Sequence, residues 1–264
     1  MGLREAGRHH WRTHKNDALI VSFVMMVLST LSFSVIAPIS ALSTRVDPVL
    51  LLSAGSLVAL LAHIPFVKNL KQRLKTCPRR SYMLVGFGGG LVGWAYVLFT
   101  IALRQSDNAI IQVLIFELYP VVIIFLAGLF LAKQKIRAQH YFWMLVCLVG
   151  VAMLMLEGKE LSYQGFIYAA QEELNMVAMV FSAVFLLAMG MVFIIKASRV
   201  MGGSSADSIF TSLLVRGATV LLTLPFVTWS QLGDFVTGFD IISLAHILAY
   251  GVFALTISNV LYYP

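Results

Sequence analysis

The stretch Ala109–Ala132, AIIQVLIFELYPVVIIFLAGLFLA, is long and apolar enough to cross a bilayer as one helix, because a span needs about 20 apolar residues. Glu117 and Pro120 lie near its midpoint. A carboxylate inside the membrane is costly and normally faces a cavity or a partner. Proline lacks a backbone donor, which frees the carbonyl of Phe116. The stretch therefore predicts a spanning helix with a polar, slightly broken centre, as a solute pathway requires.

The rest of the chain is similarly apolar. Of its 264 residues, 59% are hydrophobic and 12% are charged, which is more apolar surface than a soluble domain of this size can bury. The apolar runs are continuous, which favours helices over a membrane β-barrel. The two cysteines, Cys77 and Cys147, make no disulfide framework. We therefore predict an all-α polytopic membrane protein.

Eight apolar runs are expected to be transmembrane helices. A signal peptide has a shorter apolar core and a small-residue cleavage site, so we interpret the first run as a retained helix. The predicted helices are Ala18–Leu42, Val49–Val67, Tyr82–Leu103, Ala109–Ala132, Tyr141–Leu156, Leu174–Ile195, Ile209–Trp229 and Ile241–Tyr263.

The net charge of +7 is unevenly distributed along the chain. Fifteen of the Lys and Arg residues lie in the N-terminal arm and in the second, fourth and sixth loops, whereas three lie in the alternate loops. Basic residues gather in cytoplasmic loops, so the N-terminus is predicted to be cytoplasmic. This topology accounts for the charge without a nucleic-acid partner. Arg216, the remaining basic residue, lies inside the seventh predicted helix.

An internal repeat is visible at a constant offset between the second and seventh helices. The matching segments are Asp47–Pro48 and His63–Val67 around the second helix, and Asp207–Ser208 and Thr223–Val227 around the seventh. The charge distribution places Pro65 at a cytoplasmic helix end and Pro225 at an external one. The two copies then cross the membrane in opposite directions, as inverted transporter repeats do. Chance similarity between two leucine-rich helices is the alternative.

The repeat divides the chain into three parts. Residues 1–17 form a basic cytoplasmic arm, residues 18–158 a first unit of five helices, and residues 159–264 a second unit with three helices. By inverted-repeat symmetry we expect two further helices, or roughly 50–60 residues, so the second unit is expected to be truncated.

Several short motifs are similar to those of one known family. Leu98–Leu103 resembles an "aromatic, two residues, Ala-Leu" ending of a third helix, and Leu118–Val121 with Leu131–Lys135 resembles an "L-x-P-hydrophobic … L-G-E-x" fourth helix. Gln139 with Leu148–Val151 resembles a "Q … G-hydrophobic" fifth helix. In the second unit, Leu214–Gly217 resembles the "L-R-F" of its second helix, and Val260–Pro264 resembles the start of another "aromatic, two residues, Ala-Leu" ending. The chain thus resembles the EamA-like members of the drug/metabolite transporter (DMT) superfamily, which have ten helices in two inverted five-helix units. One departure is Ala132-Lys133, where the family has Gly-Glu.

The resemblance implies that the third, fourth and eighth helices line a central cavity. Candidate substrate or coupling residues on these helices are Trp94, Tyr96, Glu117, Tyr119, Pro120, Ser258 and Asn259. Aromatic faces with a few polar groups suit a solute of mixed polarity. Ordinary helix packing is the alternative interpretation for each of the residues outside the fourth helix.

Two charges inside the membrane need an explanation. Glu117 is interpreted as a substrate or proton site, because desolvation would raise the pKa of its carboxyl group and let it exchange protons during transport. A structural pairing, for example with Arg216, is the alternative. Arg216 itself is expected to pair with a helix-end group or a carbonyl rather than with solute, because the family carries a similar arginine away from the pathway.

Other motifs are expected to carry no chemistry. Gly88–Gly93 satisfies G-x-G-x-x-G but lies in an apolar span, so we expect close helix packing, with Gly86 near Gly90 and Gly89 near Gly93 on common faces. The histidines of the N-terminal arm lie among basic residues and are expected to be solvated rather than bound to a metal. We predict no catalytic site, no cofactor and no metal.

The predicted function is secondary transport of a small organic metabolite, such as an amino acid or drug-like compound, by alternating access. In the family efflux is the commoner direction. The chain contains no ATP-binding module, so a solute or proton gradient is expected to supply the energy. The alternative is a non-transporting membrane scaffold or a truncated inactive product. We expect an inner (plasma) membrane location.

Overall fold

The structure is a computed structural model, which describes residues 46–106, 109–116, 118–130, 174–202, 204–237 and 241–257, with a few single residues between 24 and 42 and between 142 and 149. The regular elements in these ranges are all helices. Four of them are long and apolar enough to cross a membrane, namely Pro48–Phe66, Arg79–Gln105, Leu174–Met201 and Asp207–Phe226. The predicted helices Ala18–Leu42 and Tyr141–Leu156 fall almost entirely outside the described residues. Within these ranges the fold is that of a helical membrane protein.

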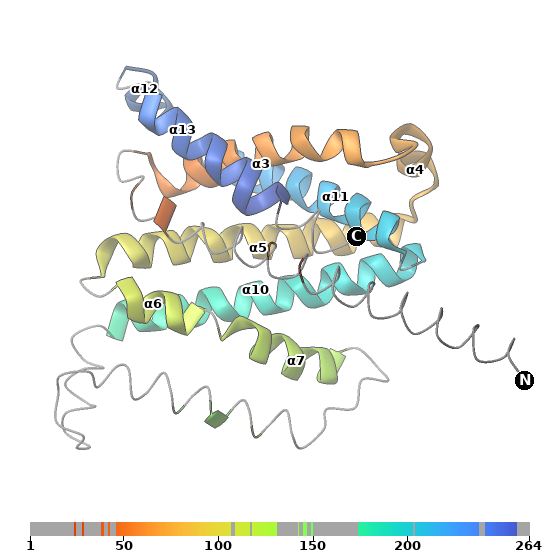
Figure 1. Cartoon of the computed structure of the whole chain (residues 1–264), viewed down its shortest axis with the longest axis horizontal. Coiled ribbons are helices and arrows are strands. Elements are labelled where there is room, and N and C mark those ends of the chain that lie inside the picture. The colour runs from red at the N-terminus through yellow and green to blue at the C-terminus, as the bar shows by residue number, and fades with distance from the viewer. Residues whose placement is uncertain are drawn as a thin grey trace, which may run out of the picture.

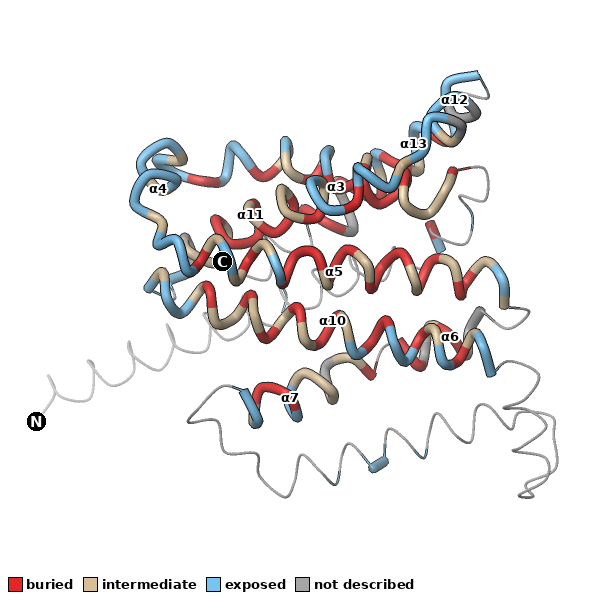
Figure 2. The backbone as a smooth tube through the Cα atoms, turned by 180° about the vertical axis from the view of Figure 1, so that it is seen from behind, coloured by how far each residue is buried: buried red, intermediate tan, exposed pale blue. Residues whose placement is uncertain are grey.

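The long helices pack as a bundle (Figure 1). Its elements are α3 (Pro48–His63), η1 (Ile64–Phe66), α4 (Leu70–Thr76), α5 (Arg79–Gln105), α6 (Ala109–Phe116), α7 (Tyr119–Phe130), α10 (Leu174–Met201), α11 (Ser205–Thr223), η2 (Leu224–Phe226), α12 (Trp229–Thr237), α13 (Ile241–Ala249) and the π-helix η3 (Tyr250–Ile257). α5 packs against α10 on one side and α11 on the other, α11 packs against α3, and α6 and α7 pack on α10. Buried residues run along α5 and α11, whose faces meet other helices (Figure 2).

The stretch Ala109–Ala132 is divided into two helices. α6 ends at Phe116, Leu118 forms a turn, and α7 begins at Tyr119. The Leu118 N–H donates to the Ile115 carbonyl at 3.1 Å, so the end of α6 tightens to an i−3 hydrogen bond. Pro120 cannot donate a hydrogen bond of its own to continue α6. The predicted break at the centre is confirmed, but its extent is larger than expected, because one continuous helix becomes two.

The elements of residues 48–76 recur in the second half of the chain. α3, η1 and α4 are matched in order and kind by α11, η2 and α12. Each long helix ends in a three-residue 3₁₀ turn with proline at its second position, Pro65 or Pro225. The seventh helix starts earlier than predicted: Ser204 is its N-cap, and Asp207 closes the capping box three residues later.

The two matching helices α3 and α11 are antiparallel neighbours. Ser53 near the start of α3 is hydrogen-bonded to Thr223 at the end of α11, with 2.8 Å between the hydroxyl oxygens. His63 at the end of α3 is hydrogen-bonded through Nε2 to the hydroxyl of Ser212, at 3.2 Å, in the first half of α11. The short helices α4 and α12 therefore lie at opposite ends of the bundle, as Figure 1 shows.

Glycines allow the central helices to approach closely. A Cβ atom on Gly88 would lie 2.8 Å from the Gly190 carbonyl oxygen, so α5 and α10 cross almost backbone to backbone. On the next face, a Cβ on Gly89 would lie 2.9 Å from Ala218, and one on Gly93 would lie 3.0 Å from Thr219. The predicted packing face of Gly89 and Gly93 is confirmed and meets α11.

The prediction that Gly86 and Gly90 form a second packing face is confirmed only for Gly90. A Cβ on Gly90 would lie 2.6 Å from Leu222, whereas one on Gly86 would have no neighbour within 4 Å.

Candidate functional site

Arg216 is the centre of the candidate site. It lies in the middle of α11, and only 6% of its surface is exposed. Its Nε and Nη1 atoms have no hydrogen-bond acceptor within the part of the chain that the structure describes. The hydroxyls of Tyr96 on α5 and Tyr250 on η3 are close enough to interact with its charge, and so is His63 on α3. Four elements thus converge on one buried cation.

A cluster of aromatic rings extends from this region to the break between α6 and α7. The ring of Tyr96 lies 6.0 Å from that of Phe116, the last residue of α6, and Phe99 stacks on Phe116 at 3.9 Å. Tyr119, the first residue of α7, lies 6.1 Å from Phe116 between ring centroids. Tyr96 therefore connects the surroundings of Arg216 to the broken helix.

The structure brings some of the predicted site residues together and separates others. Tyr96 and Tyr119 both border the ring of Phe116, and Pro120 follows Tyr119 in the first turn of α7. Trp94 instead packs edge-on against Phe226 of η2, at 4.9 Å between ring centroids. Residues two apart on a helix point about 200° apart, so Trp94 and Tyr96 face different neighbours.

Three of the predicted residues lie outside the described part of the chain. They are Glu117, Ser258 and Asn259. The proposed pairing of Glu117 with Arg216 is accordingly a prediction still.

Buried polar side chains join α3 to α11 in a way that was not predicted from the sequence. We call this set the polar seam and define it as Ser53, His63, Ser212 and Thr223. The His63 Nδ1–H donates to the Ala59 carbonyl at 2.7 Å, because that oxygen can only accept, and Nε2 is hydrogen-bonded to the Ser212 hydroxyl. Thr223 also donates to the carbonyl of Thr219 at 2.8 Å. Buried hydroxyls need such partners, so the seam fixes the register of the two helices.

The signal for this seam was present in the sequence. Its α11 members share one helical face with Arg216, since they lie four residues before it and seven after it. The same face carries Thr219, which donates to the Gly89 carbonyl at 3.0 Å.

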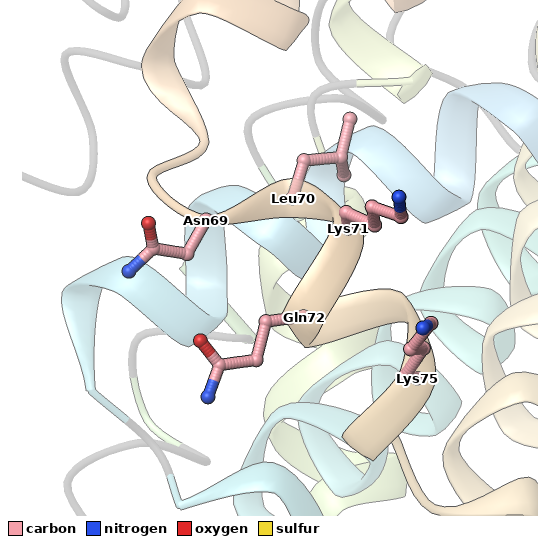
Figure 3. A pocket seen from close by; sticks show the side chains of 5 residues that line it. All are labelled: Asn69, Leu70, Lys71, Gln72 and Lys75. Carbon is pink, nitrogen blue, oxygen red and sulfur yellow. The ribbon is translucent and has the colours of Figure 1, made fainter.

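A separate pocket lies on the surface beside α4 (Figure 3). It has a volume of about 490 Å³ and is lined by Asn69, Leu70, Lys71, Gln72 and Lys75. None of the predicted site residues lies in it. Within the described residues no group of three or more His, Cys, Asp or Glu side chains is placed to hold a metal ion.

A bundle of long apolar helices with a buried cation and a broken helix is the architecture of a multi-pass helical membrane protein. The sequence model of the EamA-like transporter family matches residues 20–156, more than half of the chain. The chain therefore belongs to the EamA-like transporter family, a family of the DMT superfamily.

The fold of this chain resembles that of a solved protein structure. One solved crystal structure is similar with a TM-score of 0.53 and 16% sequence identity, and the match covers 94% of this chain and 78% of that one. At such low identity the likeness shows the fold alone. No curated protein matches the sequence significantly.

Proposed function

We propose that the protein is a secondary transporter that exports a small organic metabolite across the inner (plasma) membrane. It works by alternating access between an inverted pair of units, residues 18–158 and 159–264, with the N-terminus in the cytoplasm. The repeated order of α3–η1–α4 and α11–η2–α12, and the antiparallel packing of α3 on α11, support this arrangement. In such carriers the solute site lies between the two units.

The observation that carries the proposal is the break between α6 and α7. Irregular backbone within a membrane protein is tolerated where it is buried in protein or lines a water-filled cavity, and broken helices mark the substrate sites of many carriers. This break adjoins the rings of Tyr96 and Tyr119 and, through Tyr96, the buried Arg216. An aromatic surface beside a charge suits a solute with one apolar and one polar part.

Transport by the purified protein in proteoliposomes tests the proposal. A panel of labelled amino acids, organic acids and amphipathic drugs is loaded, and efflux is followed with and without a pH gradient. Saturable efflux of at least one solute above that of empty liposomes supports transport. Efflux equal to that of empty liposomes for the entire panel, with the protein correctly folded, favours the non-transporting scaffold instead.

Glu117 is the proposed coupling residue, because a carboxyl group in the middle of a span can exchange a proton with either side. The substitution Glu117→Gln keeps the shape of the side chain and removes the titratable proton. We expect efflux in the variant to lose its dependence on the pH gradient while solute exchange persists. An unchanged dependence on the gradient would remove Glu117 from the mechanism.

A further inference from the structure

The charge on Arg216 is not balanced by any side chain that the structure describes. The carboxylates of the described membrane helices are engaged at helix ends: Asp47 caps α3, and Asp207 binds Arg73 at 2.7 Å. Asp207 also lies nine residues before Arg216, or about 13 Å along the helix. A buried guanidinium with open donors is costly in a membrane and is normally paired with an anion or a hydrogen-bond acceptor.

A second open polar group lies in the same region. The hydroxyl of Ser56 on α3 is fully buried and has no hydrogen-bond partner within the described residues. The bonds Ser53–Thr223 and His63–Ser212 fix the register of the two helices and place Ser56 roughly one helical turn from the level of Arg216. The open groups of α3 and α11 thus meet in one interface, beside Tyr96 and Tyr250.

The surroundings favour a particular kind of anion. Arg216 is the one permanently charged group among these side chains, and both ring nitrogens of His63 are already hydrogen-bonded, to the Ala59 carbonyl and the Ser212 hydroxyl. A dianionic phosphate would keep one charge unbalanced, whereas a carboxylate matches a single planar guanidinium fork. The rings of Tyr96, Phe116 and Tyr119 supply an apolar surface alongside.

We infer that Arg216 binds the carboxylate of a small organic acid with an apolar or aromatic body. The inference rests on the proposed transport function, since that acid would be the solute carried. Ser56 and the hydroxyl of Tyr250 supply further hydrogen bonds around the same anion.

Thermal unfolding of the purified full chain in detergent tests this site directly. The probes are benzoate, its neutral analogue benzamide, and inorganic phosphate. We expect benzoate to raise the Tm with increasing concentration, and the other two to leave it unchanged. Arg216→Gln should abolish the benzoate response. Arg216→Lys, which lacks the planar fork, should bind benzoate about tenfold more weakly.

The matched control is Arg199→Gln at the exposed end of α10, which should respond to benzoate as the wild type does. A wild-type benzoate response in Arg216→Gln overturns the inference, as does an equal response to benzamide or phosphate. If Arg216→Gln fails to fold, Arg216→Lys decides: weakened binding supports the site, and wild-type affinity overturns it.

The test separates this inference from the proposed function. A benzoate response that depends on Arg216, in a protein that moves no solute in liposomes, keeps the anion site and refutes transport. Efflux that is saturable and unaffected by Arg216→Gln keeps transport and refutes the anion site.

Discussion

At the scale of single residues, His63 shows how the bundle handles polar groups inside a membrane. Both ring nitrogens are hydrogen-bonded, one within α3 and the other to α11, and the side chain is fully buried. Thr223, which takes the equivalent position in the second copy of the repeat, likewise bonds both to its own helix and across to the partner helix. Equivalent positions in the two copies therefore join α3 and α11 near both ends of their contact.

Replacing His63 with alanine should destabilise the protein by about 1–3 kcal/mol, because the buried Ser212 hydroxyl loses its partner. The change should appear as a lower Tm in detergent. The double variant His63→Ala/Ser212→Ala removes the orphaned hydroxyl as well and should recover part of the loss. If the double variant is as unstable as the sum of the single ones, the hydrogen bond contributes nothing.

The ion pair between Arg73 of α4 and Asp207 of α11 links the first copy of the repeat to the second. Arg73 also lies over the ring of Phe210 at 6.0 Å. Because both charged groups are only partly buried, we expect a coupling of about 0.5–1 kcal/mol in a double-mutant cycle of Arg73→Ala and Asp207→Asn, measured by thermal unfolding. High salt should reduce it, and strict additivity of the two substitutions would show that the pair is not coupled.

At the scale of elements, the crossing of α5 and α10 depends on two glycines that face each other. A Cβ on Gly190 would lie 2.7 Å from the Gly88 carbonyl oxygen, which cannot move without bending α5. We expect Gly190→Ala to cost about 1–3 kcal/mol by forcing the helices apart. Gly86→Ala is the matched control, since the new methyl group meets open space and alanine favours a helix. Equal stabilities of the two variants would exclude the close crossing.

Helices that are determined by apolar composition and by helix-breaking residues such as proline could be predicted from the sequence. Helices that depend on tertiary contacts could not. Pro120 signalled the division into α6 and α7, and the constant offset between the repeated segments signalled the match of α3 with α11. The short helix α12 falls between the predicted helices Ile209–Trp229 and Ile241–Tyr263, because its nine residues lack a continuous apolar run. The π-helix η3 has no local signal, since its residues are ordinary helix formers of a buried segment.

The candidate site was only partly predictable for the same reason. Residue type and depth in the span single out Tyr96, Tyr119 and Arg216, and Tyr96 lies near Arg216 and, with Tyr119, borders Phe116. Trp94 was named with Tyr96 because both are aromatic, although helical geometry alone places them on different faces. Tyr250 has no such signal in the sequence, because its proximity to Arg216 arises from the packing of η3 on α3, where its ring lies against Gly55.

At the scale of the whole molecule, the antiparallel copies predict opposite exposure of α4 and α12. In a variant without native cysteines (Cys77→Ser, Cys147→Ser), we would introduce Gln72→Cys on α4 or Gly233→Cys on α12, both at exposed positions. A membrane-impermeant maleimide should label the α12 variant in intact cells, and the α4 variant only after permeabilisation. Labelling of both from the same side would contradict the inverted arrangement.

The polar faces of α3 and α11 also constrain how the chain is made. An arginine at the centre of a helix opposes insertion by about 2.5–3.5 kcal/mol, and α11 carries Arg216 together with several hydroxyls. α3 and α5 are synthesised earlier, so the hydrogen-bonding surface that receives α11 is already in the membrane when α11 leaves the translocon. The order of the two copies along the chain is therefore part of the folding mechanism. The less polar helix α3 inserts first and provides the surface on which α11, whose insertion into lipid alone is unfavourable, can pack.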